Sequence, residues 1–420
     1  MEESSEIDFD SASENIVSDA IEDPIALDNS FTSSFTENNE NSSHSSIDFD
    51  LPKNISSVIK VIGVGGGGSN AVNYMIKEGI KGVDFIICNT DAQALEKGQA
   101  PTKLQLGMSI TEGLGAGENP SVGEKAALES EHEIHSILQN NTKMVFITAG
   151  MGGGTGTGAA PVIAEIAKEL GALTVAVVTK PFNFEGQKRK AAAEQGIAEL
   201  VEEVDSLITI PNQKLMDILG RKTSMEEAFA KADDILKGAV QGISDIIMKP
   251  GYINVDFADV KTVMSEKGIA MMGTGQSSAD ERGIDAASQA VSSELLEDIE
   301  LKDARGILVN ITAKSPTMAD FDEVDSVIRD FTADDATIIY GTVMEDSMDE
   351  EELLVTVVAT GVNQKTATLA VDNSKRATVK LNPVGLETHK IDQSVESGGT
   401  SSAEDIDFLD VPTFMRKQVD

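Results

Sequence analysis

Residues 150–158 read Gly150-Met-Gly-Gly-Gly-Thr-Gly-Thr-Gly158 and follow the apolar run Met144-Val-Phe-Ile-Thr148. An apolar run of this kind predicts a buried strand. The glycines let backbone N–H groups come close to an anion, and the N-terminus of a following helix adds a positive dipole. The stretch therefore predicts a phosphate-binding turn between a strand and a helix.

A second glycine-rich loop, Gly63-Val-Gly-Gly-Gly-Gly-Ser-Asn70, follows the short apolar run 58–62. One such loop could equally be a tightly packed turn without a ligand. Two of them, each ahead of a helical stretch, favour phosphate binding. Hydroxyl donors could come from Ser69, Thr155 and Thr157.

The glycine spacing leaves more than one nucleotide open. The pattern Gly63-x-Gly65-x-x-Gly68 matches the dinucleotide fingerprint. However, the expected acid, Asp84, lies at the start of the next strand rather than at its end, and the second loop has no role in that interpretation. No Gly-Lys pair occurs anywhere in the chain, which argues against a lysine-containing P-loop. Backbone amides would then hold the phosphates.

Composition excludes several classes of protein. The formal net charge of −38 repels phosphate backbones, so we expect no nucleic-acid partner. Cys88 is the single cysteine, which excludes an intramolecular disulfide. The first residues are acidic and polar, and the longest uncharged run, 144–164, contains six glycines and Pro161. We therefore expect no secretory signal and no direct membrane insertion.

Apolar runs alternate with helical patterns up to about Gly361, which predicts an α/β fold of parallel βαβ units. Apolar residues recur every three or four positions from Met225 to Met248, which predicts one long helix joining two α/β lobes. The predicted segments are a disordered acidic head (1–56), a nucleotide-binding domain (57–224), the central helix (225–250), a smaller α/β domain (251–364), a disordered linker (365–404) and a short terminal segment (405–420).

Five motifs occur together in one order: the two glycine loops, Asn89-Thr-Asp91, Pro181-Phe-Asn-Phe-Glu-Gly186 and Asn254-Val-Asp-Phe-Ala-Asp259. In this combination the chain resembles the FtsZ family of tubulin-like GTPases over about 58–362 and the last dozen residues. The resemblance implies a tubulin-like fold, GTP and GDP binding, and head-to-tail filaments of the cell-division ring with GTP sites between subunits.

The resemblance assigns GTP contacts to both loops and to four later side chains. They are Gly66, Gly67, Gly68, Ser69, Asn70, Gly152, Gly153, Gly154, Thr155, Gly156, Thr157, Glu185, Arg189, Phe229 and Asp233. The spacing of Glu185 and Arg189 also fits a simple helix salt bridge. Phe229 would stack on guanine, and Asp233 would accept hydrogen bonds from its N–H edge. Asp234 is adjacent, so either carboxylate could take this role.

On sequence alone, Asp256 is an N-cap and Asp259 is the third residue of the helix that follows. The resemblance implies that Asn254, Asp256 and Asp259 enter the nucleotide site of the next subunit, where the two carboxylates polarise the attacking water. Capping would hold these carboxylates rigidly, as positioning a water requires. Mg²⁺ is expected with the nucleotide, and no acidic pair in the sequence identifies itself as its direct ligand.

The chain ends in a peptide that resembles the family's partner-binding tail. Its predicted contact residues are Phe408, Leu409, Val411, Pro412, Phe414, Met415, Arg416 and Lys417. The resemblance implies a cytoplasmic protein at the mid-cell division site, whose tail binds membrane-tethering and regulatory proteins. Two alternatives remain: an NAD-dependent oxidoreductase, which would not polymerise, and a GTP-binding structural protein without turnover.

Overall fold

The computed structural model describes residues 59–220, 222–249, 251–266, 268–293, 304–333 and 335–362. The predicted head, linker and tail lie outside these residues, as do all eight predicted tail contacts. The domain boundaries given above stay predictions.

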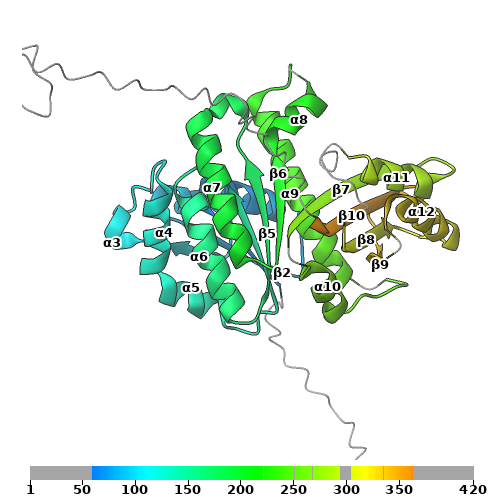
Figure 1. Cartoon of the computed structure of the whole chain (residues 1–420), viewed down its shortest axis with the longest axis horizontal. Helices are drawn as coiled ribbons and strands as arrows, with labels where there is room; N and C mark the ends of the chain where they lie inside the picture. The colour runs from blue at the N-terminus through cyan, green and yellow to red at the C-terminus, as the bar shows by residue number, and fades with distance from the viewer. Residues whose placement is uncertain are drawn as a thin grey trace, which may run out of the picture. The chain divides into compact units, whose positions relative to one another are not determined.

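Ten strands form one continuous sheet in the order β3-β2-β1-β4-β5-β6-β7-β10-β8-β9 (Figure 1). The strands are β1 (Ile59–Val64), β2 (Val83–Asn89), β3 (Thr102–Gln105), β4 (Met144–Gly150), β5 (Leu173–Lys180), β6 (Ser206–Pro211), β7 (Ile269–Ser277), β8 (Gly306–Ala313), β9 (Thr337–Met344) and β10 (Leu353–Val362). The helices are α1 (Gly65–Lys77), α2 (Ala92–Lys97), α3 (Met108–Thr111), α4 (Pro120–Glu129), α5 (Glu131–Leu138), α6 (Thr155–Glu169), the 3₁₀ turn η1 (Asn183–Glu185), α7 (Gln187–Glu203), α8 (Asn212–Leu219), α9 (Met225–Met248), α10 (Phe257–Met264), α11 (Arg282–Val291) and α12 (Met318–Phe331).

The first half of the sheet, β1 to β6, is parallel throughout, as the alternating pattern predicts. Helices cover both of its faces, so its central strands are buried on both sides and read as unbroken apolar runs. β1 and β4 are neighbours, with Val64 opposite Ala149. The two glycine loops therefore leave the sheet side by side.

The second half of the sheet, β7 to β10, departs from the prediction. β10 is antiparallel to both β7 and β8, so parallel pairing up to Gly361 was a wrong expectation for this strand. Only residues 345–352 separate β9 from β10. A parallel return needs a crossover of about a dozen residues or more, so this short connection reverses the chain.

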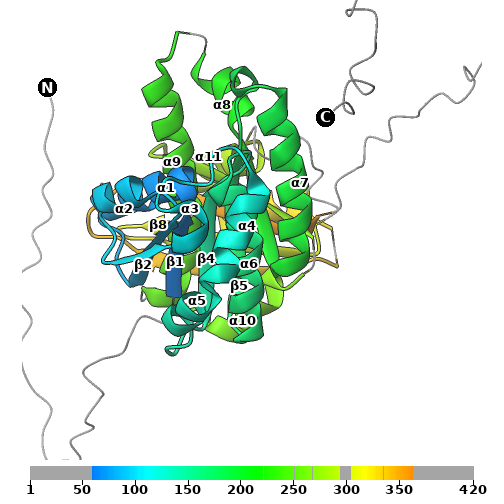
Figure 2. The same ribbon diagram turned by 90° about the vertical axis from the view of Figure 1, so that its left-hand side faces the viewer.

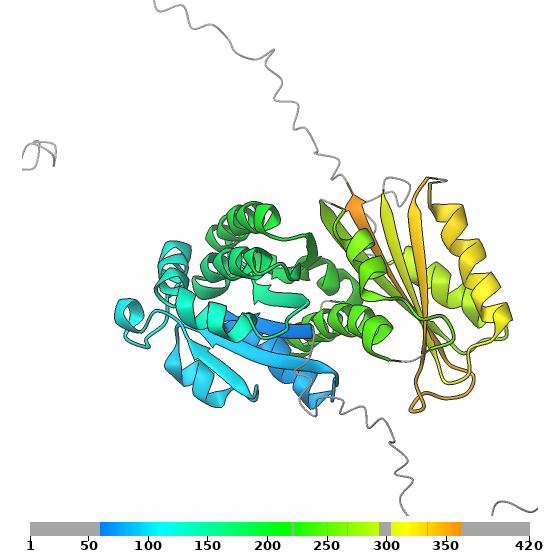
Figure 3. The same ribbon diagram turned by 90° about the horizontal axis from the view of Figure 1, so that it is seen from below.

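Three apolar clusters pack on the sheet. α1, α9 and α10 share a cluster on one face that extends across both halves. α4 to α7 cover the opposite face of the first half, and α11 and α12 cover that of the second half, as Figure 3 shows for the yellow α12. Cys88 is buried in the first half, as expected of a small apolar side chain.

The helix α9 has the predicted bounds, Met225–Met248, and begins at a capping box formed by Ser224 and Glu227. Its 24 residues span about 35 Å. Phe229, near its start, contacts Phe182, which follows the carboxyl end of β5. Met248, its last residue, lies beside Gly82 just before β2. The helix therefore runs from the carboxyl ends of the parallel strands to their amino ends.

Candidate nucleotide site and catalytic loop

The two glycine loops meet at the carboxyl ends of β1 and β4. A Cβ atom on Gly67 would lie 3.1 Å from the Gly150 backbone, and one on Gly65 would lie 2.8 Å from the Gly156 nitrogen. Gly65 also has a φ of +71°, which other residues rarely adopt. Both loops therefore need glycine because their backbones pack directly on each other.

The helices that leave these loops begin without a cap. The N-cap residues Val64 and Gly154 make no side-chain cap hydrogen bond to α1 or α6, and neither helix has an acidic residue in its first turn. Bare helix N-termini carry unsatisfied N–H donors and a partial positive charge. A Cβ atom on Gly66 or Gly153 would meet no other atom within 4 Å. The space beside both loops is thus open to an anion such as a phosphate.

The three predicted hydroxyl donors also hold the loops in shape. Ser69 donates to the Gly65 carbonyl at 2.7 Å, and Thr157 accepts from the Gly152 N–H at 2.8 Å. Thr155 shares a buried hydrogen bond of 2.6 Å with Thr90. Thr90 is the central residue of the Asn89-Thr-Asp91 motif but was not predicted as a contact, although it immediately follows β2 and so lies at the same edge of the sheet.

Glu185 and Arg189 form an ion pair at 2.8 Å, but not within one helix as their spacing would allow, because Glu185 ends η1 and Arg189 lies in the first turn of α7. Arg189 also contacts Glu118 at 3.1 Å, and its hydrogen bond lowers the pKa of that carboxyl. A Cβ atom on Gly152 would collide with the Arg189 backbone. The pair therefore lies against the second glycine loop and links it to the segment before α4.

An aromatic group lies beside the N-terminal part of α9. Phe182 is buried and stacks on Phe184 at 5.1 Å, while Phe229 meets its edge at 5.2 Å. Phe184 and Phe229 remain partly exposed and can accept a flat ring. Asn212, at the start of α8, has a buried side-chain oxygen without a hydrogen-bond partner. The sequence prediction missed Asn212, although its place directly after a buried strand was a usable signal.

The neighbours Asp233 and Asp234 differ sharply in their surroundings. Asp234 pairs with Lys231 at 3.0 Å and with Lys237 at 3.7 Å. No cation in the described part of the chain pairs with Asp233, and burial raises its pKa to about 7. A desolvated carboxylate without a partner is costly unless a ligand supplies donors. This difference favours Asp233 as the acceptor for a base.

The loop before α10 presents three polar side chains to solvent. Asp256 caps α10 by accepting the Asp259 N–H at 2.9 Å, which confirms the predicted cap. Asn254 accepts the Gly251 N–H at 2.9 Å. Val255 is buried between these exposed residues and anchors the loop. The carboxylates are therefore exposed yet attached to a fixed backbone.

A single chain does not bring this loop to the glycine loops. Phe229 lies at the carboxyl ends of the parallel strands, whereas Asn254 follows the other end of α9, which is about 29 Å from Phe229 along the helix. Figure 2 shows α1 and α10 at opposite ends of the sheet. Of the predicted site residues, the glycine loops, Glu185 and Arg189 gather at one end, and Asn254, Asp256 and Asp259 lie at the other.

The described residues contain neither a metal-binding cluster nor a membrane-spanning helix. No group of three or more His, Cys, Asp or Glu side chains is placed to hold a metal ion there. Nor does any helix in that part of the chain have the length and apolar character needed to cross a membrane.

Comparison with known proteins agrees with this geometry. The model of the Tubulin/FtsZ family GTPase domain matches residues 58–220, and the model of the FtsZ family C-terminal domain matches residues 268–363. The fold and the paired glycine loops thus define a tubulin-like protein with a GTPase domain.

Similarity to individual proteins is more specific. The cell division protein FtsZ of Pseudomonas putida is 53% identical over 399 residues, covering 89% of this chain and 100% of the relative. FtsZ of Pseudomonas aeruginosa is 52% identical over 395 residues, with the same coverage. A solved FtsZ dimer of M. jannaschii matches with a TM-score of 0.69 and 43% identity, covering 73% of this chain and 88% of that one. The chain belongs to the FtsZ family, which confirms the resemblance seen in its motifs.

Proposed function

We propose that this chain binds GTP, hydrolyses it to GDP and phosphate, and assembles head-to-tail into filaments of the cell-division ring. The observation that carries the proposal is the separation of the two site halves by the length of α9. Glycine loops at one end and a rigid acidic loop at the other would form one site only where two copies meet end to end. Such a heterologous contact does not close on itself, so it gives an open polymer.

In this proposal the free N–H groups at the starts of α1 and α6 bind the phosphates. Phe229 takes the face of guanine, and Asp233 accepts hydrogen bonds from its N–H edge. Adenine offers a different edge and would leave the Asp233 carboxylate unpaired, at a cost of roughly 1–3 kcal/mol. The surroundings of Asp233 support this choice over Asp234.

The hydrolytic step would be completed by the next subunit. Asp256 and Asp259 accept hydrogen bonds from a water aimed at the γ-phosphorus and so polarise it, with Asn254 beside them; one proton of the water leaves as the new bond forms, and the other stays on the phosphate product. The water oxygen forms the new bond as the bond to the oxygen bridging the β- and γ-phosphates breaks, and GDP leaves. Because Asp256 is fixed by its hydrogen bond to the Asp259 N–H, the loop loses little conformational entropy when it binds the water.

We further propose that Mg²⁺ accompanies the nucleotide and neutralises phosphate charge. Exposed Asn70 beside the first loop could contact its water shell. From the family resemblance we also propose that the protein is cytoplasmic and located at mid-cell. The tail residues would bind membrane-tethering and regulatory proteins.

The test is phosphate release per subunit, measured with GTP and Mg²⁺ across protein concentrations while light scattering is recorded. We expect negligible release at low concentration and a sharp rise together with scattering. Release per subunit that stays constant with concentration, without scattering, would mean that one chain holds a complete site. Scattering without release would instead favour a GTP-binding structural protein.

A further inference from the structure

The catalytic loop lies along the free edge of β9. The Thr342 N–H donates to the Ile253 carbonyl at 3.1 Å, and the Ile253 N–H donates to the Thr342 hydroxyl at 2.8 Å. β9 is the last strand of the sheet and pairs with β8 on its other side. Thr342 thus binds the residue directly before Asn254 through both its backbone and its side chain.

The backbones of strand and loop are also in close contact. A Cβ atom on Gly251 would collide with the Thr342 carbonyl oxygen. On the strand, a Cβ atom on Gly341 would lie 3.3 Å from the side chain of the buried Val255. Glycine on each side therefore lets the loop sit directly on β9, so a shift of the strand edge would shift the loop.

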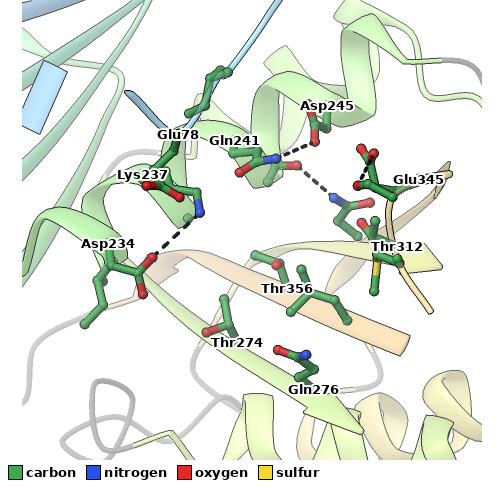
Figure 4. Close-up of a pocket in the computed structure, with 18 of the residues that line it drawn as sticks. Glu78, Asp234, Lys237, Gln241, Asp245, Thr274, Gln276, Thr312, Glu345 and Thr356 are labelled. Carbon is green, nitrogen blue, oxygen red and sulfur yellow. Dashed lines mark hydrogen bonds and ion pairs between the residues drawn. The ribbon is translucent and has the colours of Figure 1, made fainter. Parts of the chain in front are cut away.

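Two ion pairs of one lysine hold the start of the loop near the carboxyl end of β9. Lys249, which follows α9, contacts Asp245 at 3.0 Å and Glu345 at 2.6 Å. Its hydrogen bond lowers the pKa of Glu345. Figure 4 shows Asp245 and Glu345 at the same end of a cleft of about 790 Å³. The loop is therefore held at two points, by Thr342 in β9 and, through Lys249 at its start, by Glu345 directly after β9.

We propose that Thr342 is a positioning residue for GTP hydrolysis: its hydroxyl holds Ile253 and so orients Asn254, Asp256 and Asp259 toward the nucleotide of the next subunit. This inference rests on the proposed function of the loop. Thr342 is buried in β9, in the second half of the sheet. It acts only through the backbone that it binds.

The side chain matters because the Ile253 N–H has its acceptor in the Thr342 hydroxyl. Valine has the same shape without that acceptor, so the N–H would turn away to find water. A displacement of about 1 Å at reacting groups can lower a rate by about 100-fold. We expect a smaller effect here, about tenfold, because the backbone bond from Thr342 to Ile253 remains.

The experiment compares the full-length variants Thr342→Val, Thr342→Ala and Thr342→Ser. GTP affinity is measured on unassembled subunits, and phosphate release is measured per sedimented subunit. We expect valine and alanine to lower release about tenfold with unchanged GTP affinity, and serine to recover most of the loss. Thr337→Val is the matched control, because Thr337 is an exposed threonine at the start of the same strand.

Hydrogen exchange gives a second readout that needs no assembly. In Thr342→Val, amides of residues 251–255 should exchange faster while those of the glycine loops stay unchanged. Wild-type release in both valine and alanine variants, or an equal loss in all three including serine, would overturn the proposal. Asp259→Ala is run beside them. If it keeps normal release, the proposed function of the loop itself has failed, which is a different outcome from failure of Thr342 alone.

Discussion

The helices at the two ends of the sheet begin in opposite ways. α1 and α6 start bare, with free N–H groups and no acid in the first turn. α10, at the other end, starts with the Asp256 cap and carries Asp259 in its first turn. A bare start attracts an anion, whereas an acidic, capped start fixes carboxylates and repels one. The two ends therefore favour opposite charges: the bare starts favour a bound anion, whereas the capped start carries fixed negative charge.

Among the variants that test this difference between the two ends, Asp259→Ala is expected to have the largest effect. We expect GTP binding by the free subunit to stay normal and phosphate release to fall by roughly 100-fold or more, because a water-polarising group is lost. The measurement is release per assembled subunit beside a nucleotide-binding titration. Asp322→Ala, an exposed acid on α12, is the control and should behave as the wild type.

The next largest effect is expected from placing an acid at the bare end. Gly153→Asp puts a carboxylate into open space beside α6, where it competes with phosphate for the helix N-terminus. GTP affinity should fall by roughly tenfold or more. Gly153→Ala tests the same position without charge and should bind clearly better than the aspartate variant. Equal affinities of the two variants would argue against phosphate at this helix.

A smaller effect is expected for Asp233→Asn. The amide can still accept one hydrogen bond but cannot match both guanine donors, so GTP affinity should fall by about 10-fold, close to the loss of a charged hydrogen bond. Asp234→Asn is the matched variant, since Asp234 is already paired with Lys231. If Asp234→Asn weakens GTP binding more, the base contact has been assigned to the wrong neighbour.

The raised pKa of Asp233 predicts that the folding stability of the nucleotide-free chain depends on pH. Burial raises the pKa of folded Asp233 from 3.8 to about 7. Its protonated form therefore favours the folded state, and this contribution is lost as pH rises from about 4 through 7. Asp233→Asn should raise the melting temperature more at pH 8 than at pH 5. Equal shifts at both pH values would mean that Asp233 ionises normally.

The smallest expected effect on stability separates the two roles of Asp256. Asparagine also caps helices, so Asp256→Asn should keep the melting temperature and lose most phosphate release. Asp256→Ala should lose both, with a cap cost of about 0.5–2 kcal/mol. Thermal unfolding and release assays on the two variants check this. Normal release in the asparagine variant would assign Asp256 to capping alone.

Local features could be predicted from sequence because each depends on neighbours in the chain. The bounds of α9 follow from its apolar spacing, and the cap at Asp256 follows from the acid three residues later. The direction of β10 could not be predicted, because it depends on strands β7 and β8 that are distant in sequence. The same holds for the site. Asp233 and Asp234 are adjacent acids that the sequence cannot distinguish, and only burial in the folded chain separates them. The proposed role of Thr342 likewise depends on the packing of the loop on β9.

The contact between Ile253 and β9 also covers part of an outer strand of the sheet. An outer strand with free N–H and C=O groups invites pairing with another chain, and proteins protect such strands by covering or shortening them. At one border of the sheet, β3 has only four residues. At the other, the loop with Asn254 and Asp256 shields β9. We therefore expect the segment proposed to complete hydrolysis also to limit pairing at this edge, so variants that loosen it should precipitate more readily.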